Sequence, residues 1–98
     1  MPVPDHAFLV SVNGIVSPVT PDNGKFFTLD EAQALVGGDV QLITLQRKPF
    51  ILYALMDEDG LMKRLPLNPE ASRIATQKMG RDMILVGPIV ICPHKFFR

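Results

Sequence analysis

The hydrophobic pattern near the N-terminus predicts a β-hairpin. Apolar residues fill most of positions 7–12 and return over positions 15–19, and Asn13-Gly14 separates the two runs. Asn-Gly between apolar runs favours a two-residue type I′ turn, in which both central residues have positive φ. Pro18 has no N–H to give to a ladder, so the returning strand is expected to lie at a sheet edge or to end early.

The next pattern has helical spacing and predicts a short helix with both ends specified. Thr28 is a natural N-cap, and Glu31 three residues later completes a capping box. Gly37 is expected to take the left-handed conformation that ends the helix, and Gly38 adds freedom for the chain to turn back. Four apolar residues recur at helical spacing and define the expected inner face: Leu29, Ala32, Leu35 and Val36.

Three strands are predicted to follow as a meander, over residues 40–45, 50–56 and 61–65. The second run is almost continuously apolar, which indicates that both of its faces are covered by a helix, a second sheet or a subunit. The sequence Asp-Glu-Asp-Gly at residues 57–60 is typical of a tight turn between the second and third strands.

A second helix is predicted after this meander, followed by a β-rich run. Asn68 is the expected cap, Pro69 occupies the first helical position, where its missing N–H costs nothing, and Gly80 ends the helix. The expected inner face consists of Ala71, Ile74, Ala75 and Met79. Residues 83–92 then read as strand, and Gly87-Pro88 within them predicts a bulge or a join between two short strands.

The predicted order is therefore ββ-α-βββ-α-β. Hairpins in place of alternating βα units indicate an α+β fold with a mainly antiparallel sheet and two short helices. A chain of 98 residues accommodates one hydrophobic core, so residues 1–98 are expected to form a single domain. The end segments 1–6 and 93–98 are expected to be flexible or to dock in an oligomer.

Composition narrows the class of protein. Lys and Arg number 10 and Asp and Glu number 10, so the formal net charge is zero, which argues against a mainly electrostatic nucleic-acid binder. The single cysteine, Cys92, allows no intrachain disulfide and suits a reducing cytosol. The N-terminus shows no signal-peptide pattern, and no apolar run approaches the roughly 20 residues of a bilayer span. We therefore expect a cytoplasmic protein that does not insert in a membrane.

The sequence offers no catalytic constellation, and we expect a protein without enzymatic activity, cofactor or metal. His6 and His94 lie near opposite termini, where an exposed terminal residue is a more frequent role than a base or a ligand. Cys92 follows a β-branched run and is expected to be a small buried hydrophobe. The acidic turn at residues 57–60 lacks the glycine and glutamate spacing of an EF-hand loop.

Ligand binding is the remaining chemistry to consider. The two glycines after the first helix do not form a phosphate loop, because such loops place glycines before a helix. The N-terminus of that helix can still hold an anion through its free N–H groups. The candidate residues for a small anionic ligand are Lys25, Thr28, Gly37, Gly38, Arg47, Lys63 and Arg64. The tail, with Lys95 and Arg98 beside two phenylalanines, could contact a nucleic-acid strand, but zero net charge favours a frayed or dimer-docking tail.

Three blocks of this sequence together resemble the family of a domain of unknown function, number 3846. They are NGKFFTLDEAQALVGG at residues 23–38, DEDGLMKRLPLNPEA at residues 57–71 and ILVGPIVI at residues 84–91. Pro88 departs from the resemblance, since a polar residue is expected there, so the last strand is expected to bend differently. The family is associated with bacteriophages, plasmids and other mobile elements. The resemblance implies that setting and brings no catalytic residue set.

The expected function is therefore that of a non-enzymatic accessory binding protein of a bacteriophage or mobile element, in the cytoplasm of a bacterial host. It would counter host defence by sequestering a small anionic or nucleotide signal or by occupying a host protein, and it is expected to form a homo-oligomer with a pocket between subunits. The alternative is a nucleic-acid-associated accessory protein in mobile-element maintenance. The sequence does not decide between these functions.

Overall fold

The computed structural model describes residues 7–47, 50–93 and 96. Its strands form one antiparallel sheet in the order β2-β1-β5-β4-β3. The elements are β1 (Ala7–Val10), β2 (Val16–Val19), α1 (Leu29–Val36), β3 (Val40–Arg47), β4 (Phe50–Asp57), α2 (Pro69–Met79) and β5 (Ile89–Pro93). The predicted α+β class with a mainly antiparallel sheet and two short helices is confirmed.

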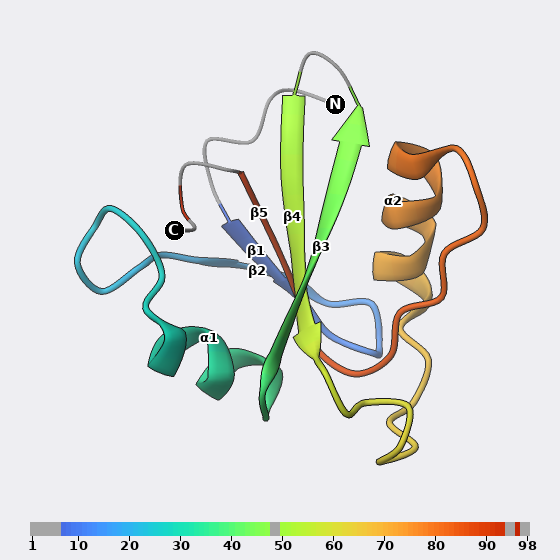
Figure 1. Ribbon diagram of the computed structural model, residues 1–98, viewed down its shortest axis with the longest axis horizontal. Helices are drawn as coiled ribbons and strands as arrows, with labels where there is room; N and C mark the ends of the chain where they lie inside the picture. The colour runs from blue at the N-terminus through green and yellow to red at the C-terminus, as the bar shows by residue number, and fades with distance from the viewer. Residues whose placement is uncertain (1–6, 48–49, 94–95, 97–98) are drawn as a thin grey trace.

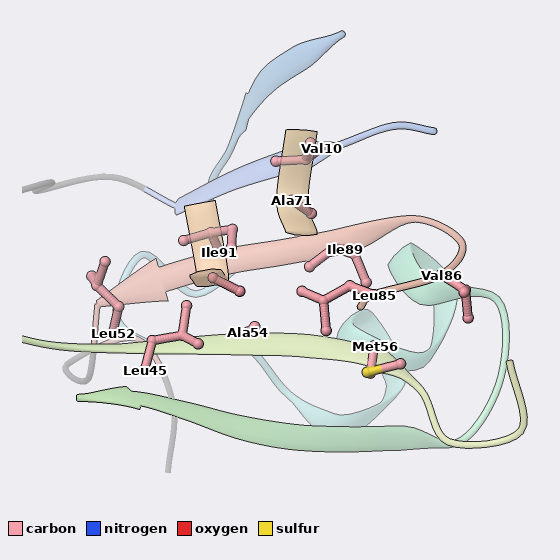
Figure 2. Packing of buried hydrophobic residues seen from close by; sticks show 11 residues of the cluster. Val10, Leu45, Leu52, Ala54, Met56, Ala71, Leu85, Val86, Ile89 and Ile91 are labelled. Carbon is pink, nitrogen blue, oxygen red and sulfur yellow. The ribbon is translucent and has the colours of Figure 1, made fainter. Parts of the chain in front are cut away.

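The sheet is the middle layer of three, with one helix on each face. Figure 1 shows the sheet nearly edge-on, with β3 nearest the viewer, α1 on the left and α2 on the right. One core cluster lies under α2 and includes Ala71 and Ala75 of that helix (Figure 2). The other lies under α1 and includes Ala32 and Val36. Three of these four residues are alanines, whose small side chains let each helix approach the sheet closely.

The position of β4 between the two helices explains why its sequence is continuously apolar. Ala54 and Met56 point into the cluster under α2, whereas Leu55 between them belongs to the cluster under α1. Successive side chains of a strand point to opposite faces, so a strand between two helices has no solvent face. The prediction that both faces of this run are covered is confirmed for the side chains described from Leu52 onward.

Both predicted helix caps are confirmed. Thr28 accepts a hydrogen bond from the Glu31 N–H and forms the capping box, and Gly37 ends α1 with φ of 87°. Pro69 starts α2, and Gly80 ends it with φ of 71°. One inner-face prediction is wrong, because Leu29 is 62% exposed. It is the first residue of α1, and the buried residues of this helix are Ala32 and Val36.

The N-terminal hairpin is confirmed, but its turn is not type I′. Only Gly14 has positive φ there, at 88°, and Asn13 does not. The Gly14 N–H donates to the Ser11 carbonyl, and the Ser11 N–H donates to the Ile15 carbonyl. This is a three-residue loop, in which a tight turn is followed by a left-handed glycine. The register fixes the length of this loop. Val10 pairs with Val16, so the next pair inward, Ser11 with Ile15, encloses three residues, one more than the two central residues of a type I′ turn.

The predicted strand at residues 61–65 is absent, and the segment forms consecutive turns. The Lys63 N–H donates to the Asp59 carbonyl and the Leu65 N–H to the Gly60 carbonyl, which coils the chain back on itself. Arg64 has φ of 58°, a left-handed conformation that no strand allows. The only pairing described nearby is an isolated bridge between Leu67 and Val86.

The β-rich run at residues 83–92 was predicted as strand on both sides of Gly87-Pro88, but only the part from Ile89 onward forms a strand. Val86 makes the isolated bridge, Gly87 turns with φ of 73°, and β5 begins at Ile89. Beyond β5, Phe96 packs edge-on against Phe27, with 6.3 Å between ring centroids. The predictions for residues 1–6 and for 94, 95, 97 and 98 lie outside the described residues.

Candidate functional site

The most strongly constrained polar group is the Asp57 carboxylate, at the end of β4 where two candidate residues meet. Asp57 is 1% exposed. Its Oδ2 accepts a hydrogen bond from Lys63 Nζ at 2.7 Å, and its Oδ1 accepts one from the Asp59 N–H at 2.9 Å. The Lys63 side chain remains 44% exposed. The pair thus fastens the turn segment after β4 to the end of that strand.

Gly38 provides the space for this ion pair. A Cβ at this position would lie 2.7 Å from Asp57 Oδ2 and 2.7 Å from Lys63 Nζ. A Cβ at Gly37 would have no atom within 4 Å, so glycine is needed there because of its positive φ. Glycine is therefore needed at these two adjacent positions for different reasons. The sequence prediction explained Gly37 correctly but gave Gly38 only a turning role, since the approach of Asp57 and Lys63 depends on tertiary structure.

The charges of the pair stabilise one another. The hydrogen bond from Lys63 lowers the pKa of Asp57, and the Asp59 N–H lowers it further. The hydrogen bond to Asp57 raises the pKa of Lys63, assisted by the nearby charges of Asp59 and Asp39. Both groups stay ionised near neutral pH, so neither is poised to exchange a proton with a substrate. The ammonium of Lys63 already has an anionic partner within this chain.

The N-terminus of α1 is occupied by a carboxylate of this chain. Glu31 accepts hydrogen bonds from the Asp22 N–H at 2.9 Å and the Thr28 N–H at 3.1 Å. These two backbone bonds, with that from Asp22 first, lower the pKa of Glu31. Lys25 is exposed, and its own N–H donates to Asn23 Oδ1. An external anion would have to compete with Glu31 for this end of the helix.

The structure brings together only part of the predicted ligand set. Gly37, Gly38 and Lys63 lie at the C-terminal end of α1, and Thr28 lies at its other end. Arg64 follows Lys63 but makes its own left-handed turn and is exposed. Arg47 is the last of the eight residues of β3, at the opposite end of that strand from Val40, and its side chain lies outside the described ones. The set therefore does not form a single anion pocket.

A feature that the sequence prediction missed is a group of exposed apolar side chains around this turn segment. Leu61 is 74% exposed, Met62 85%, Leu67 52% and Ile84 72%. The bridge between Leu67 and Val86 joins the turn segment to the segment that runs from the end of α2 down the right side of Figure 1 to β5. We call these four residues the apolar tip. Interpreting residues 61–65 and 83–92 as strands concealed it, because apolar residues in strands are expected to be buried.

Other chemistry is limited in the described part of the chain. No three His, Cys, Asp or Glu residues gather there in a way that could hold a metal ion. Cys92 is fully buried, and burial raises the pKa of its thiol to about 12. His6 and His94 lie outside the described residues. None of the helices described is long and apolar enough to cross a membrane.

These observations define a small α+β domain, with an antiparallel sheet between two helices and, at one end of the sheet, a buried carboxylate paired with a half-exposed lysine. The family model for a domain of unknown function, DUF3846, matches residues 7–95. The chain therefore belongs to this family, as the three sequence blocks indicated. No curated protein and no solved structure matches the chain.

Proposed function

We propose that this protein is a non-catalytic accessory protein that acts by binding another protein through the apolar tip. The supporting observation is the exposure of Leu61, Met62, Leu67 and Ile84 on two segments joined by a backbone bridge. Charged residues border these side chains, since Glu58 and Asp59 precede them and Lys63 and Arg64 follow Met62. An exposed apolar group with a polar rim is typical of a protein-binding surface.

Protein binding is favoured over sequestration of a small anionic signal. Lys63, the candidate cation nearest to the glycine pair, is already paired with Asp57. The N-terminus of α1, the candidate anion site near Thr28, already carries the capping box, in which the Glu31 carboxylate accepts from the Thr28 N–H. An anionic ligand would have to displace a carboxylate of the protein at either place, which costs part of its binding energy.

The proposed setting is the cytoplasm of a bacterial host, during replication of a bacteriophage or another mobile element. The chain belongs to the DUF3846 family, and the association of that family with bacteriophages and mobile elements is the reason for proposing this setting. In that setting, the proposed partner is a host protein that presents an apolar pocket for the side chains of the apolar tip. Occupying such a protein is one route by which a small accessory protein counters host defence.

The test is affinity capture from host lysate, followed by reconstitution with purified partner. The double variant Met62→Asp/Ile84→Asp disrupts the apolar tip, whereas the control Ile15→Asp places one aspartate at a 59% exposed apolar position in the N-terminal hairpin. A captured host protein supports the proposal if purified components bind, Ile15→Asp binds equally well and the double variant binds at least about tenfold more weakly.

Other results of the same experiments would overturn it. Equal binding of the double variant would exclude the apolar tip as the interface. A retained nucleotide in native mass spectrometry would support the sequestration function instead. Binding to nucleic acid with a steep salt dependence would support the maintenance alternative.

A further inference from the structure

The two edges of the sheet differ in how they are protected. Edge strand β2 has four residues and contains Pro18. Edge strand β3 has eight residues, pairs with β4 in an unbroken register and contains no proline. Its residues from Val40 to Gln46 carry no charge. Exposed edges are normally blunted by short length, proline, bulges or charges. By these criteria β2 is protected and β3 is open.

The register shows which backbone groups of β3 face outward. The Glu58 N–H donates to the Asp39 carbonyl, so the adjacent Val40–Asp57 pair is of the non-hydrogen-bonded kind. The two kinds of pair alternate along an antiparallel ladder. Leu42 and Thr44, like Val40, therefore direct their N–H and C=O groups away from β4. No described strand pairs with this edge, and no helix is drawn in front of it in Figure 1.

The same rule explains the position of Pro18 on the opposite edge. The Ser11 N–H donates to the Ile15 carbonyl, so Val10–Val16 is a non-hydrogen-bonded pair and so is Phe8–Pro18. The missing N–H of Pro18 would have faced outward. This proline removes a donor from the outer edge without costing the sheet a ladder bond.

We propose that the open edge of β3 pairs with β3 of a second copy of this chain, antiparallel and about a two-fold axis at Ile43. In this register Leu42 lies opposite Thr44 of the copy, and Val40 lies opposite Gln46. Each of these outward-facing pairs occurs twice by symmetry and exchanges two hydrogen bonds, so about eight hydrogen bonds form between the two copies. The two sheets then continue as one, and this self-association is independent of the proposed host-protein function.

Charges select this register over its neighbours. With the axis at Ile43, Asp39 lies opposite Arg47 of the copy, and the pairing occurs twice by symmetry. Moving the axis to Leu42 or Thr44 removes both pairings. The strand between them is uncharged, so no charged residue faces its own copy near the axis. Leu42, which is 37% exposed, is covered by the partner strand in this arrangement.

The first experiment introduces into β3 a proline like the one that protects the edge strand β2. Thr44→Pro removes an outward N–H and no bond to β4, whereas Thr44→Val keeps the N–H and is the matched control. Sedimentation velocity over a wide concentration series should show dimers for the full chain and for Thr44→Val. Thr44→Pro should raise the dimer dissociation constant at least about tenfold, since one bond is lost in each copy along with close approach of the strands. Circular dichroism checks that each variant is folded.

The second experiment uses charge and does not depend on a proline being tolerated. Arg47→Glu alone places two acidic residues opposite each other at both ends of the pairing, and Asp39→Arg alone places two arginines there. Each single variant should dimerise roughly tenfold more weakly than the parent chain. An equimolar mixture of the two should regain dimers, because every opposed pair is again of opposite sign.

Hydrogen exchange gives a readout at the level of single residues. The amides of Leu42 and Thr44 should exchange more slowly as protein concentration rises. The amide of Ile43, which faces β4, should be protected at every concentration. A parent chain that stays monomeric throughout the series would overturn the proposal, and so would a Thr44→Pro variant that is folded and dimerises like the parent. A mixture that fails to recover dimers would overturn the register.

Discussion

Replacing Asn68 is expected to destabilise the fold more than loss of an ordinary helix cap does. Asn68 is fully buried. Its Oδ1 accepts from the Ala71 N–H at 3.0 Å, which caps α2. Its Nδ2 donates to the Val10 carbonyl at 2.8 Å and to the Gly87 carbonyl at 2.9 Å. One amide thus joins a helix start, a central strand and the turn before β5.

The magnitude follows from counting these bonds. A side-chain N-cap contributes about 1 kcal/mol, and each further buried hydrogen bond contributes about 1 kcal/mol. Asn68→Ala should therefore lower the free energy of unfolding by about 3 kcal/mol. Thr28→Ala is the matched control, because its cap bond lies at an exposed helix end, and it should cost about 1 kcal/mol.

The assay is urea denaturation followed by far-ultraviolet circular dichroism, with equal m-values as the check that both variants unfold from the same state. Asn68→Asp provides a sharper test, because aspartate is as good an N-cap as asparagine. It keeps the acceptor for Ala71 but turns a carboxylate oxygen towards two carbonyls, so it should cost at least as much as Asn68→Ala. A loss below about 1 kcal/mol in either variant would refute the reasoning.

Three further predictions concern the ion pair and the buried thiol. Because the folded-state pKa of Asp57 is lowered, its stabilisation is present above its unfolded value of about 4 and is lost as pH falls through the lower folded value. Asp57→Asn should therefore lower the melting temperature at neutral pH but have much less effect in strong acid, and an equal effect at both would contradict this. Gly38→Ala should be destabilising in the parent and less destabilising in a Lys63→Ala background, because the Cβ would meet Lys63 Nζ as well as the buried Asp57 Oδ2 and only the first contact is removed; fully additive losses in a double-mutant cycle would show that Lys63 takes no part in the clash. Cys92 should resist a thiol reagent at mildly alkaline pH, given its burial and a pKa of about 12, and react fully in denaturant; rapid labelling of the folded protein would contradict the buried position.

Local rules predicted the helices because each signal lies within a few residues of its effect. Thr28 and Glu31 form their box within one turn, and Pro69 starts α2 wherever that helix packs. The turn segment was predicted wrongly because its conformation depends on distant atoms. Leu65 Cδ1 would lie 2.7 Å from a Cβ on Gly87, so these two segments fit together only in the folded chain. No spacing along the sequence contains that information.

In the candidate site, too, local features were predicted from the sequence and tertiary contacts were not. Lys63 and Gly38 were named from charge and composition, but nothing in the sequence indicated that Asp57 lies between them. Asp57 was predicted to be part of a tight turn between two strands, and it is the most buried charged residue among those described. The exposure of apolar side chains such as Met62 was also not predicted, because the hydrophobic pattern does not show which apolar residues are buried. Their burial depends on tertiary contacts.

The strand order has a consequence for how this protein is made. Strand β5 is the last strand in sequence, yet it lies between β1 and β4 in the sheet. Until it emerges from the ribosome, the hairpin of β1 with β2 and the hairpin of β3 with β4 have no strand to join them. Both then present unpaired inner edges, β1 and β4, and sheets assembled from such distant segments form slowly. The nascent chain therefore depends on a late step to hide these edges, and a truncation within β5 should leave two separate hairpins prone to aggregation.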